Sequence, residues 1–206
     1  MNEIERQKNT RVTERYRDCI LSFLDLDDIK KILRRKSSAG IRILRDFHKL
    51  VAARAPKLAA HDEICFWQDS VLLVAYVDAT TDAYTGVMSE VKVLKEAIDT
   101  ILPSHAVCVK GRTFPYKDIQ SSQTRPRVIY LSASSLAFSN CFHIENELGR
   151  DFRADWYIDT RIIRKVTARK EDHVKLVELL PRNKRRNIHM YHGSFEVPDT
   201  RADQNS

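Results

Sequence analysis

The stretch CILSFLDLDDIKKIL (residues 19–33) begins as an apolar run, breaks into carboxylates and continues with apolar residues at helical spacing. A short apolar run that ends in turn-forming residues is typical of a buried strand. Residues 29–54 keep the helical spacing, with Lys and Arg on the other face, and the small residues 37–40 predict a bend or two helices. We therefore expect a buried strand, an acidic tip and then a helical segment.

A predicted hairpin follows, because residues 62–78 contain two apolar runs separated by Gln68, Asp69 and Ser70. Further along, apolar patterning predicts helices over 80–102, 134–148 and 170–180, and strands over 105–116, 128–131, 154–163 and 187–197. The element order is β-α-β-β-α-β followed by β-α-β. It predicts an α+β fold, a ferredoxin-like antiparallel sheet with helices on one face.

Length and charge set the expected organisation of the chain. Its 206 residues suit one domain, which we place at 18–180, between an N-terminal arm (1–17) and a basic C-terminal segment with a polar tail (181–206). The chain has 35 Lys and Arg against 28 Asp and Glu, a formal charge of +7, of which residues 161–206 hold +5 and residues 1–160 only +2. We therefore expect the main domain to be nearly balanced in charge.

The sequence argues against several classes of protein. No apolar run approaches the roughly 18–20 residues of a membrane span, and no signal peptide is visible, so we expect a cytoplasmic protein without a membrane partner. The four cysteines, which lie at positions 19, 65, 108 and 141, form no CxxC pair. We predict thiols in the core, and neither a zinc site nor a disulfide framework.

Two carboxylates carry the functional prediction. Asp25 lies where the first strand ends, and Asp69 lies in the hairpin turn, so a ferredoxin-like sheet brings them to one edge. Two converging carboxylates are costly unless a cation joins them, and Mg²⁺ takes such oxygen ligands together with substrate phosphates. The alternatives are a helix cap for Asp25 and an ordinary turn residue for Asp69. Asp27 and Asp28 fit caps better than ligands.

The two segments that hold these carboxylates, FLDLDDIKKIL and ICFWQDSVLLVAY, resemble the two metal motifs of class III nucleotidyl cyclases over about residues 18–160. The resemblance implies that Asp25, Asp69 and the carbonyl of Leu26 bind two Mg²⁺ or Mn²⁺ ions. It implies a nucleoside triphosphate substrate, whose 3′-oxygen attacks the α-phosphorus and releases pyrophosphate. It also implies a homodimer with composite active sites, to which residues of the later helix and strands of one subunit contribute in the other.

The chain departs from the family pattern at several positions. Gln68 replaces a glycine, and Cys65 stands where purine cyclases place a base-reading Lys or Glu. The family's Asn-x-x-x-Arg pair aligns with Ser139 and His143, or after a shift of one residue with Asn140 and Ile144, so neither frame reproduces both residues. Positive charge for the triphosphate is expected from cations on the later strands, for which solvated faces are the alternative: Lys110, Arg112, Arg161, Arg164 and Lys165.

The missing purine reader favours a pyrimidine substrate, UTP or CTP, with Cys65 and Phe66 near the base. The chain is similar in this to the stand-alone cyclases of bacterial Pycsar anti-phage systems, which implies a separate effector protein that senses the cyclic nucleotide. The alternatives are a catalytically degenerate cyclase-like domain and an RNA-binding ferredoxin-like module. We expect nucleic acid to be an unlikely partner, because no strand has the repeated aromatics of RNA-binding domains.

Overall fold

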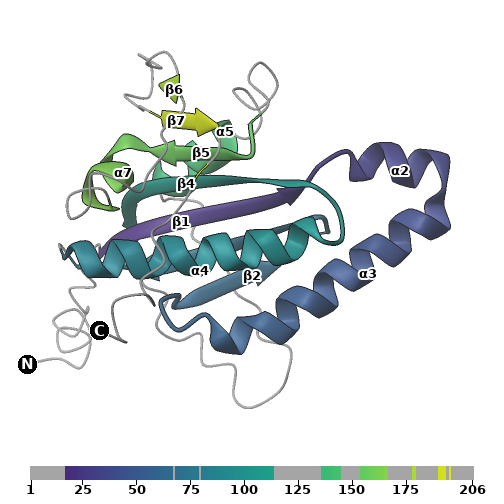
Figure 1. Ribbon diagram of the computed structural model, residues 1–206, viewed down its shortest axis with the longest axis horizontal. Coiled ribbons are helices and arrows are strands. Elements are labelled where there is room, and N and C mark those ends of the chain that lie inside the picture. The colour runs from purple at the N-terminus through teal and green to yellow at the C-terminus, as the bar shows by residue number, and fades with distance from the viewer. Residues whose placement is uncertain are drawn as a thin grey trace, which may run out of the picture.

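The computed structural model describes residues 17–66, 68–78, 80–113, 136–144, 154–166, 178–179, 190–193 and 195. These residues form a seven-stranded sheet in the order β2-β3-β1-β4-β5-β7-β6 (Figure 1). The strands are β1 (Arg17–Leu26), β2 (Glu63–Phe66), β3 (Ser70–Tyr76), β4 (Ser104–Thr113), β5 (Trp156–Asp159), β6 (Glu178–Leu179) and β7 (Met190–Gly193). The helices are α2 (Ile29–Arg35), α3 (Ser37–Arg54), the 3₁₀ turn η1 (Ala55–Lys57), α4 (Thr81–Asp99), α5 (Leu136–His143) and α7 (Thr160–Val166).

Strand β1 lies in the middle of the β-α-β-β-α-β core. It pairs antiparallel with β3 on one side and with β4 on the other, while β4 and β5 run parallel. The predicted α+β class, with its hairpin between β2 and β3, is confirmed. Strand β7 pairs with β5, so the sheet continues past residue 180, where we expected the domain to end.

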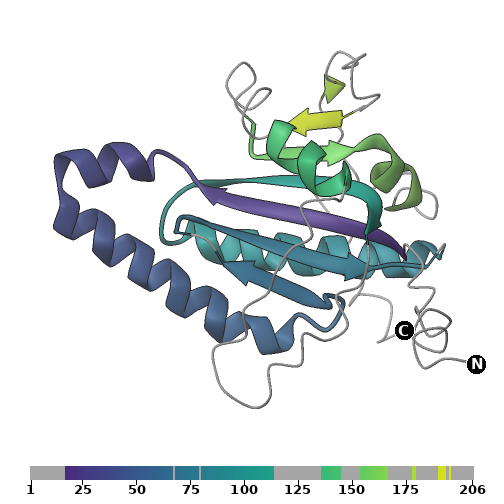
Figure 2. The ribbon, with the colours of Figure 1, turned by 180° about the vertical axis from the view of Figure 1, so that it is seen from behind.

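Both faces of the sheet are covered. Along β1, Ile20 and Leu24 pack in the core with α3, α4 and α7, whereas Leu21 and Phe23 pack in a second core with α5. Helix α4 covers the face seen in Figure 1, and α5 lies on the opposite face, seen in Figure 2. The expectation of helices on one face therefore needs correction for α5. Because β1 is apolar at successive positions, both of its sides require apolar cover.

The strand predicted over residues 154–163 is half wrong, because β5 ends at Asp159 and α7 begins at Thr160. A side-chain contact explains the change: Asp159 Oδ1 accepts a hydrogen bond from the backbone N–H of Arg161 at 2.8 Å. Such a bond from an Asp carboxylate to the backbone two residues on favours a turn or helix start over an extended chain.

Other predicted elements are only partly tested. Residues 178 and 179 belong to β6, so the helix predicted over 170–180 does not reach its expected end. The helix predicted over 134–148 is confirmed at Leu136–His143, and the strand over 187–197 at Met190–Gly193. The strand over 128–131, the basic run 181–186, residues 1–16 of the N-terminal arm and the polar tail lie outside the described residues.

The predicted interruption of the first helical segment is confirmed, and it falls at Lys36 between α2 and α3. The two helices pack closely, because Gly40 of α3 lies directly against Leu33 of α2. A Cβ atom added at Gly40 would lie 2.5 Å from Leu33 Cδ2 and 3.1 Å from its Cα. The missing side chain is therefore what permits this close approach of the two helices.

Replacing Gly40 with alanine should lower the free energy of unfolding by about 1–3 kcal/mol, because overpacking outweighs the gain in helix propensity. Denaturant titration of both variants checks this. The matched control is Gly86→Ala in α4, where an added Cβ meets nothing within 4 Å. That control should be stabilised by up to about 1 kcal/mol. Equal stabilisation of both variants would contradict the close packing at Gly40.

A buried histidine joins the turn before β2 to α4. His61 Nδ1 lies 2.9 Å from Glu90 Oε2, and the Glu90 carboxylate also accepts the backbone N–H of Ala60 at 3.0 Å. The His61 side chain is fully buried. Burial lowers the pKa of His61 below its ordinary value, against the opposing effect of Glu90. The histidine is therefore neutral in the folded protein at neutral pH.

The stability of the protein should decrease as the pH falls below about 6.5, where the histidine of the unfolded chain takes up a proton. The folded state resists that proton because the pKa of His61 is lowered. Stability is thus greatest above the unfolded pKa and is lost on acidification. Urea titrations at pH 7.5 and 5.5 measure the difference in the free energy of unfolding between the two pH values. This difference should be smaller in His61→Gln. An unchanged difference in this variant would assign the pH dependence to other groups.

The cysteines behave as predicted. All four are buried and none forms a disulfide. Burial raises the pKa of Cys19, Cys65 and Cys108 to about 12, so these thiols are neutral at physiological pH. In the described part of the chain, no helix combines the length and apolar character needed to cross a membrane.

Candidate active site

Asp25 and Asp69 come together at the end of β1. Asp25 is the penultimate residue of the strand and lies opposite Ser70, the first residue of β3. The backbone N–H of Leu26 donates to the carbonyl oxygen of Asp69 at 3.0 Å, which ties the hairpin turn to the strand end. Both carboxylates are half-buried. The structure therefore places the two predicted metal ligands, and the Leu26 backbone between them, at the edge of the sheet where β1 ends and β3 begins.

Alternation along the strand decides which face this site uses. Leu21 and Phe23 belong to the core under α5, so Asp25 continues the same row of side chains beyond that core. Leu26 points its side chain to the other face, where it is buried in the core under α3 and α4. The site thus lies on the α5 face of the sheet, at the edge where β1 leads into α2.

One residue beside Asp25, His105, was missed by the sequence analysis. His105 of β4 is the cross-strand partner of Asp25, and its Nδ1 lies 2.8 Å from Asp27 Oδ1. The ring of His105 also meets the ring of Tyr157 edge-on, with centroids 6.3 Å apart. Only the register of β1 against β4 brings His105 to this edge, and a single sequence does not reveal that register. Asp27 therefore positions His105, in addition to any effect on the helix that follows.

Helix α5 lies next to this edge. The rings of Phe142 and Phe23 are 5.0 Å apart, and Cys141 Sγ lies 3.7 Å from the carbonyl oxygen of Val107. Phe23 and Val107 are opposite each other, two residues before Asp25 on β1 and two after His105 on β4. This spacing amounts to about 7 Å along the strands.

Two candidate residues lie on α5. Asn140 is 7% exposed, and its Oδ1 accepts no hydrogen bond from any residue that the structure describes. His143 is half-buried at the end of the helix. A buried amide oxygen that lacks a donor is costly unless a ligand or water supplies one. Asn140 is therefore the polar residue of α5 that the structure singles out as a candidate for binding a ligand.

The hairpin holds the two residues expected near the base. Cys65 is buried on the α5 face of the sheet as a neutral thiol, whereas the ring of Phe66 is 44% exposed. Phe66 faces the ring of His48 from α3 edge-on at 6.2 Å, and His48 Nε2 lies 2.9 Å from the carbonyl oxygen of Gln68. His48, which the sequence analysis did not select, thus contacts and stabilises the turn that carries Asp69.

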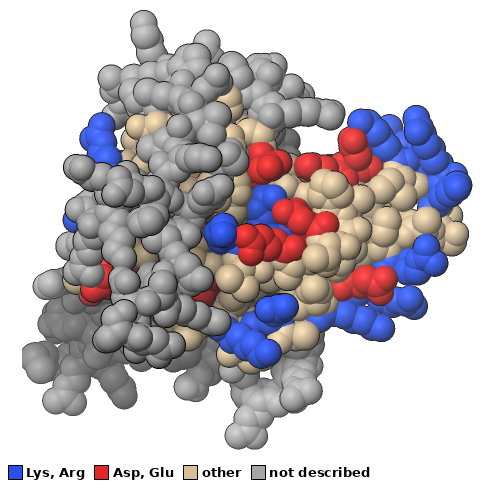
Figure 3. Space-filling model, in the orientation of Figure 1, with Lys and Arg blue, Asp and Glu red and all other residues tan. Residues whose placement is uncertain are grey.

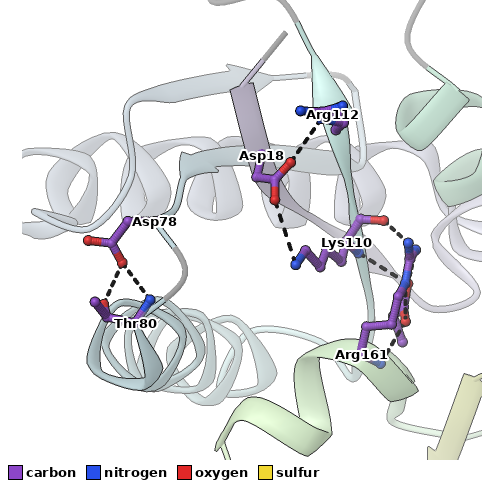
Figure 4. Close-up of polar contacts among 7 residues, drawn as sticks. Asp18, Asp78, Thr80, Lys110, Arg112 and Arg161 are labelled. Atoms are coloured by element: carbon purple, nitrogen blue, oxygen red, sulfur yellow. Dashed lines mark hydrogen bonds and ion pairs between the residues drawn. The ribbon is translucent and has the colours of Figure 1, made fainter.

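The structure does not bring the expected cations to this edge within one chain. Lys110 and Arg112 lie five and seven residues beyond His105 on β4, roughly 17 and 24 Å along the strand. Alternation puts them on the α4 face, where the Lys110 ammonium lies 5.3 Å from the centre of the Tyr84 ring. Asp18 binds both cations, at 3.8 Å from Lys110 and 3.0 Å from Arg112 (Figure 4).

The cations expected on a late strand lie instead on helix α7. Arg161 is held by Asp159, with Nη2 at 2.6 Å from Oδ2, and it also donates to the carbonyl oxygen of Lys110 (Figure 4). Arg164 and Lys165 lie one turn further on, on a helix that packs against α4. All of these residues are thus on the face opposite to Asp25.

The oxygen ligands offered by Asp25, Asp69 and the Leu26 carbonyl at the end of β1 fit a magnesium or manganese ion. They are two carboxylates and a backbone carbonyl, hard oxygen ligands of the type that Mg²⁺ takes. Among the described residues, no group of three or more His, Cys, Asp or Glu side chains forms a metal cage. Sparse coordination of this kind is usual where substrate phosphates and water complete the shell of Mg²⁺.

The fold has counterparts among solved structures. The adenylyl cyclase CyaB from P. aeruginosa matches with a TM-score of 0.60 at 10% identity, over 91% of this chain and 97% of that one. The guanylyl cyclase domain of the RhoGC fusion protein from the aquatic fungus Blastocladiella emersonii matches with 0.57 at 12%, over 88% and 96%. The guanylyl cyclase Cya2 matches with 0.52 at 8%, over 90% and 96%.

Neither a protein-family model nor a curated protein matches the sequence of this chain. At identities of 8–12% the likeness is one of architecture. The protein therefore has the fold of adenylyl and guanylyl cyclase domains, as the resemblance of its two motifs predicted.

Proposed function

We propose that the protein is a metal-dependent nucleotidyl cyclase, which converts a nucleoside triphosphate to its 3′,5′-cyclic monophosphate and pyrophosphate. The observation that carries the proposal is the meeting of Asp25 and Asp69 at one edge, tied by the bond from Leu26 to Asp69, in a cyclase fold. The bond formed joins the 3′-oxygen to the α-phosphorus. The bond broken joins that phosphorus to the oxygen of the leaving pyrophosphate, and the 3′-hydroxyl proton goes to solvent.

The two carboxylates and the Leu26 carbonyl would hold two Mg²⁺ or Mn²⁺ ions. Such ions supply charge stabilisation at the phosphates and a lowered pKa of the attacking hydroxyl. The protein's own part is to keep Asp25 and Asp69 on neighbouring strand ends, which the pairing of β1 with β3 does.

Asn140 and His143 of α5 are the polar residues that we propose to act on the substrate. The Oδ1 atom of Asn140, which accepts no hydrogen bond from the described residues, suits a ribose hydroxyl as donor. In a homodimer with composite sites, these side chains would contribute to the metal-binding site of the other subunit. Within one chain Lys110, Arg112, Arg161 and Lys165 lie on the face opposite to Asp25, so we propose that any contact of these cations with the triphosphate is made at the site of the other subunit.

We propose that the substrate is a pyrimidine nucleotide, UTP or CTP. The support is the neutral, buried thiol of Cys65 at the position of the purine reader, next to the exposed ring of Phe66. Neither side chain carries a charge that could read a purine edge, while Phe66 offers a surface for stacking. A cyclic pyrimidine nucleotide would act as a messenger for a separate effector protein in anti-phage defence.

The test is to incubate the purified protein with ATP, GTP, CTP and UTP separately, each with Mn²⁺. Cyclic monophosphate is identified by mass spectrometry, and pyrophosphate is measured by an enzyme-coupled assay. We expect product from UTP or CTP and little from the purines. Product from a purine alone would contradict the pyrimidine assignment. No product from any nucleotide, in a folded and dimeric sample, would support the degenerate cyclase instead.

A further inference from the structure

Residues 29–57, which comprise α2, α3 and η1, form a strongly charged projection that we call the basic arm. It holds ten Lys and Arg and a single acidic residue, Asp46, a net charge of +9, whereas the whole chain carries +7. All ten cations are exposed. They are Lys30, Lys31, Arg34, Arg35, Lys36, Arg42, Arg45, Lys49, Arg54 and Lys57. The rest of the protein is therefore slightly acidic, and the excess positive charge lies on one structural unit.

The basic arm extends beyond the strands of the sheet. In Figure 1 α2 and the start of α3 project to the right of the sheet, and Figure 3 shows Lys and Arg gathered around that end. Helix α3 turns Phe47 and Val51 into the core, which directs its charged residues outward. The arm is thus anchored along one side and presents its cations to solvent.

The folded protein itself gives little reason for so many cations here. Lys31 lies against Asp28, and Arg45 lies 3.8 Å from Asp46, but both pairs are exposed and such pairs contribute little to stability. Like charges four residues apart on a helix, as at Lys30 and Arg34, are destabilising. Arg34 and Arg35, in the last turn of α2, and Arg54, in the last turn of α3, gain from the helix dipole, but the other cations of the arm do not. The charge therefore points to an anionic partner.

The composition of the arm selects the kind of partner. Phe47 is its single Phe, Tyr or Trp, and it is fully buried, so the arm exposes none of these rings for single-stranded bases to stack on. Ile41 is its one large exposed hydrophobic residue. One isoleucine does not provide the apolar face that an interfacial helix inserts into a membrane, nor the clustered anchors of a protein interface. What remains is recognition of regularly spaced negative charge.

We propose that the basic arm binds the phosphate backbone of duplex nucleic acid. The 18 residues of α3 span about 27 Å, which equals about eight base pairs of a duplex. Backbone contacts from Lys and Arg carry no base sequence, so binding is independent of sequence and sensitive to salt. This proposal goes beyond the cyclase reaction and does not depend on it, because α2 and α3 bind without turnover.

The experiment measures fluorescence anisotropy of labelled duplexes of about 24 base pairs, long enough to cover α3. One duplex is DNA and the other RNA, each of scrambled sequence, and salt is raised from about 50 to about 200 mM. The arm variant combines Lys30→Gln, Arg34→Gln, Arg35→Gln and Arg42→Gln, which keeps helix propensity. The control variant removes the same charge from the C-terminal basic run, through Arg182→Gln, Lys184→Gln, Arg185→Gln and Arg186→Gln.

We expect the unmodified protein to bind at least one duplex, and the comparison of DNA with RNA shows which. The arm variant should bind at least about tenfold more weakly at low salt, and the slope of log K against log salt should fall by up to about 3.6. The control variant should keep most of its affinity.

Three results would overturn the proposal. The first is equal loss in both variants, which would make the effect one of total charge. The second is tighter binding of the single strand than of its duplex. The third is no duplex binding by the unmodified protein, whether or not it binds phosphatidylglycerol vesicles; vesicle binding in that case would assign the arm to an anionic membrane. Circular dichroism confirms that both variants are folded.

Discussion

Replacing Asp25 or Asp69 with asparagine should abolish cyclic nucleotide formation while leaving the protein folded. Each substitution keeps the size of the side chain and removes one anionic ligand of the proposed metal pair. Because such ions contribute several kcal/mol to a phosphoryl-transfer transition state, activity should fall about a hundredfold or more. Product formation by both variants is measured with the nucleotide that serves the unmodified protein, over a range of Mn²⁺ concentrations.

A second measurement separates this role from a structural one. Mn²⁺ should raise the melting temperature of the unmodified protein, and both variants should lose that shift, since a ligand stabilises only the state that binds it. The matched control is Asp46→Asn, which removes an exposed carboxylate of α3 that is not one of the proposed metal ligands. Retained activity in Asp25→Asn or Asp69→Asn would remove that residue from the metal site. Equal loss in Asp46→Asn would point to a general effect of charge.

The position of these two carboxylates could be predicted because it depends on short-range rules. The apolar run before Asp25 identifies a strand, and the two apolar runs around Asp69 identify a hairpin. In the predicted sheet topology their ends meet, and the bond from Leu26 to Asp69 is the observed result. The buried state of the four cysteines followed in the same way from the absence of any metal-binding spacing.

Features that depend on register and on which face a side chain takes could not be predicted from the sequence. His105 meets Asp25 only through the pairing of β4 with β1, and the same pairing carries Lys110 to the far end and the other face. The cations of α7 were misplaced because Asp159 starts a helix where the apolar pattern continued as a strand.

The basic arm was not recognised in the sequence because the net charge was summed over a long segment. Residues 1–160 have a net charge of +2, which suggested a balanced domain, yet residues 29–57 within them have +9. The remainder of that segment is correspondingly acidic. A shorter window along the sequence would have found the basic arm, but the exposure of all its cations and its projection from the sheet needed the structure.

Asp159→Asn should destabilise the protein strongly, because this carboxylate is a buried junction of three elements. Asp159 ends β5 with 2% exposure and accepts hydrogen bonds from the backbone and guanidinium of Arg161 in α7, and from the Lys110 N–H of β4 at 3.3 Å. Asparagine would turn an amide donor toward these donors and remove the charge. We expect a loss of about 2–3 kcal/mol, which lowers the melting temperature by about 4–12 °C.

The matched control is Asp155→Asn, four residues earlier and exposed, which should change stability by less than about 0.5 kcal/mol. The melting temperatures of the two variants are compared by thermal unfolding, and equal values would show that Asp159 has no structural role.

The result also bears on Arg161. Its guanidinium already has hydrogen-bond partners within the fold, because it binds Asp159 and the Lys110 carbonyl oxygen. Arg161→Gln would leave the Asp159 carboxylate buried without its cation, so it should lower stability together with any activity. If Arg161 instead bound a phosphate of the substrate, Arg161→Gln would lower activity alone. The unfolding measurement on Arg161→Gln therefore distinguishes the two roles.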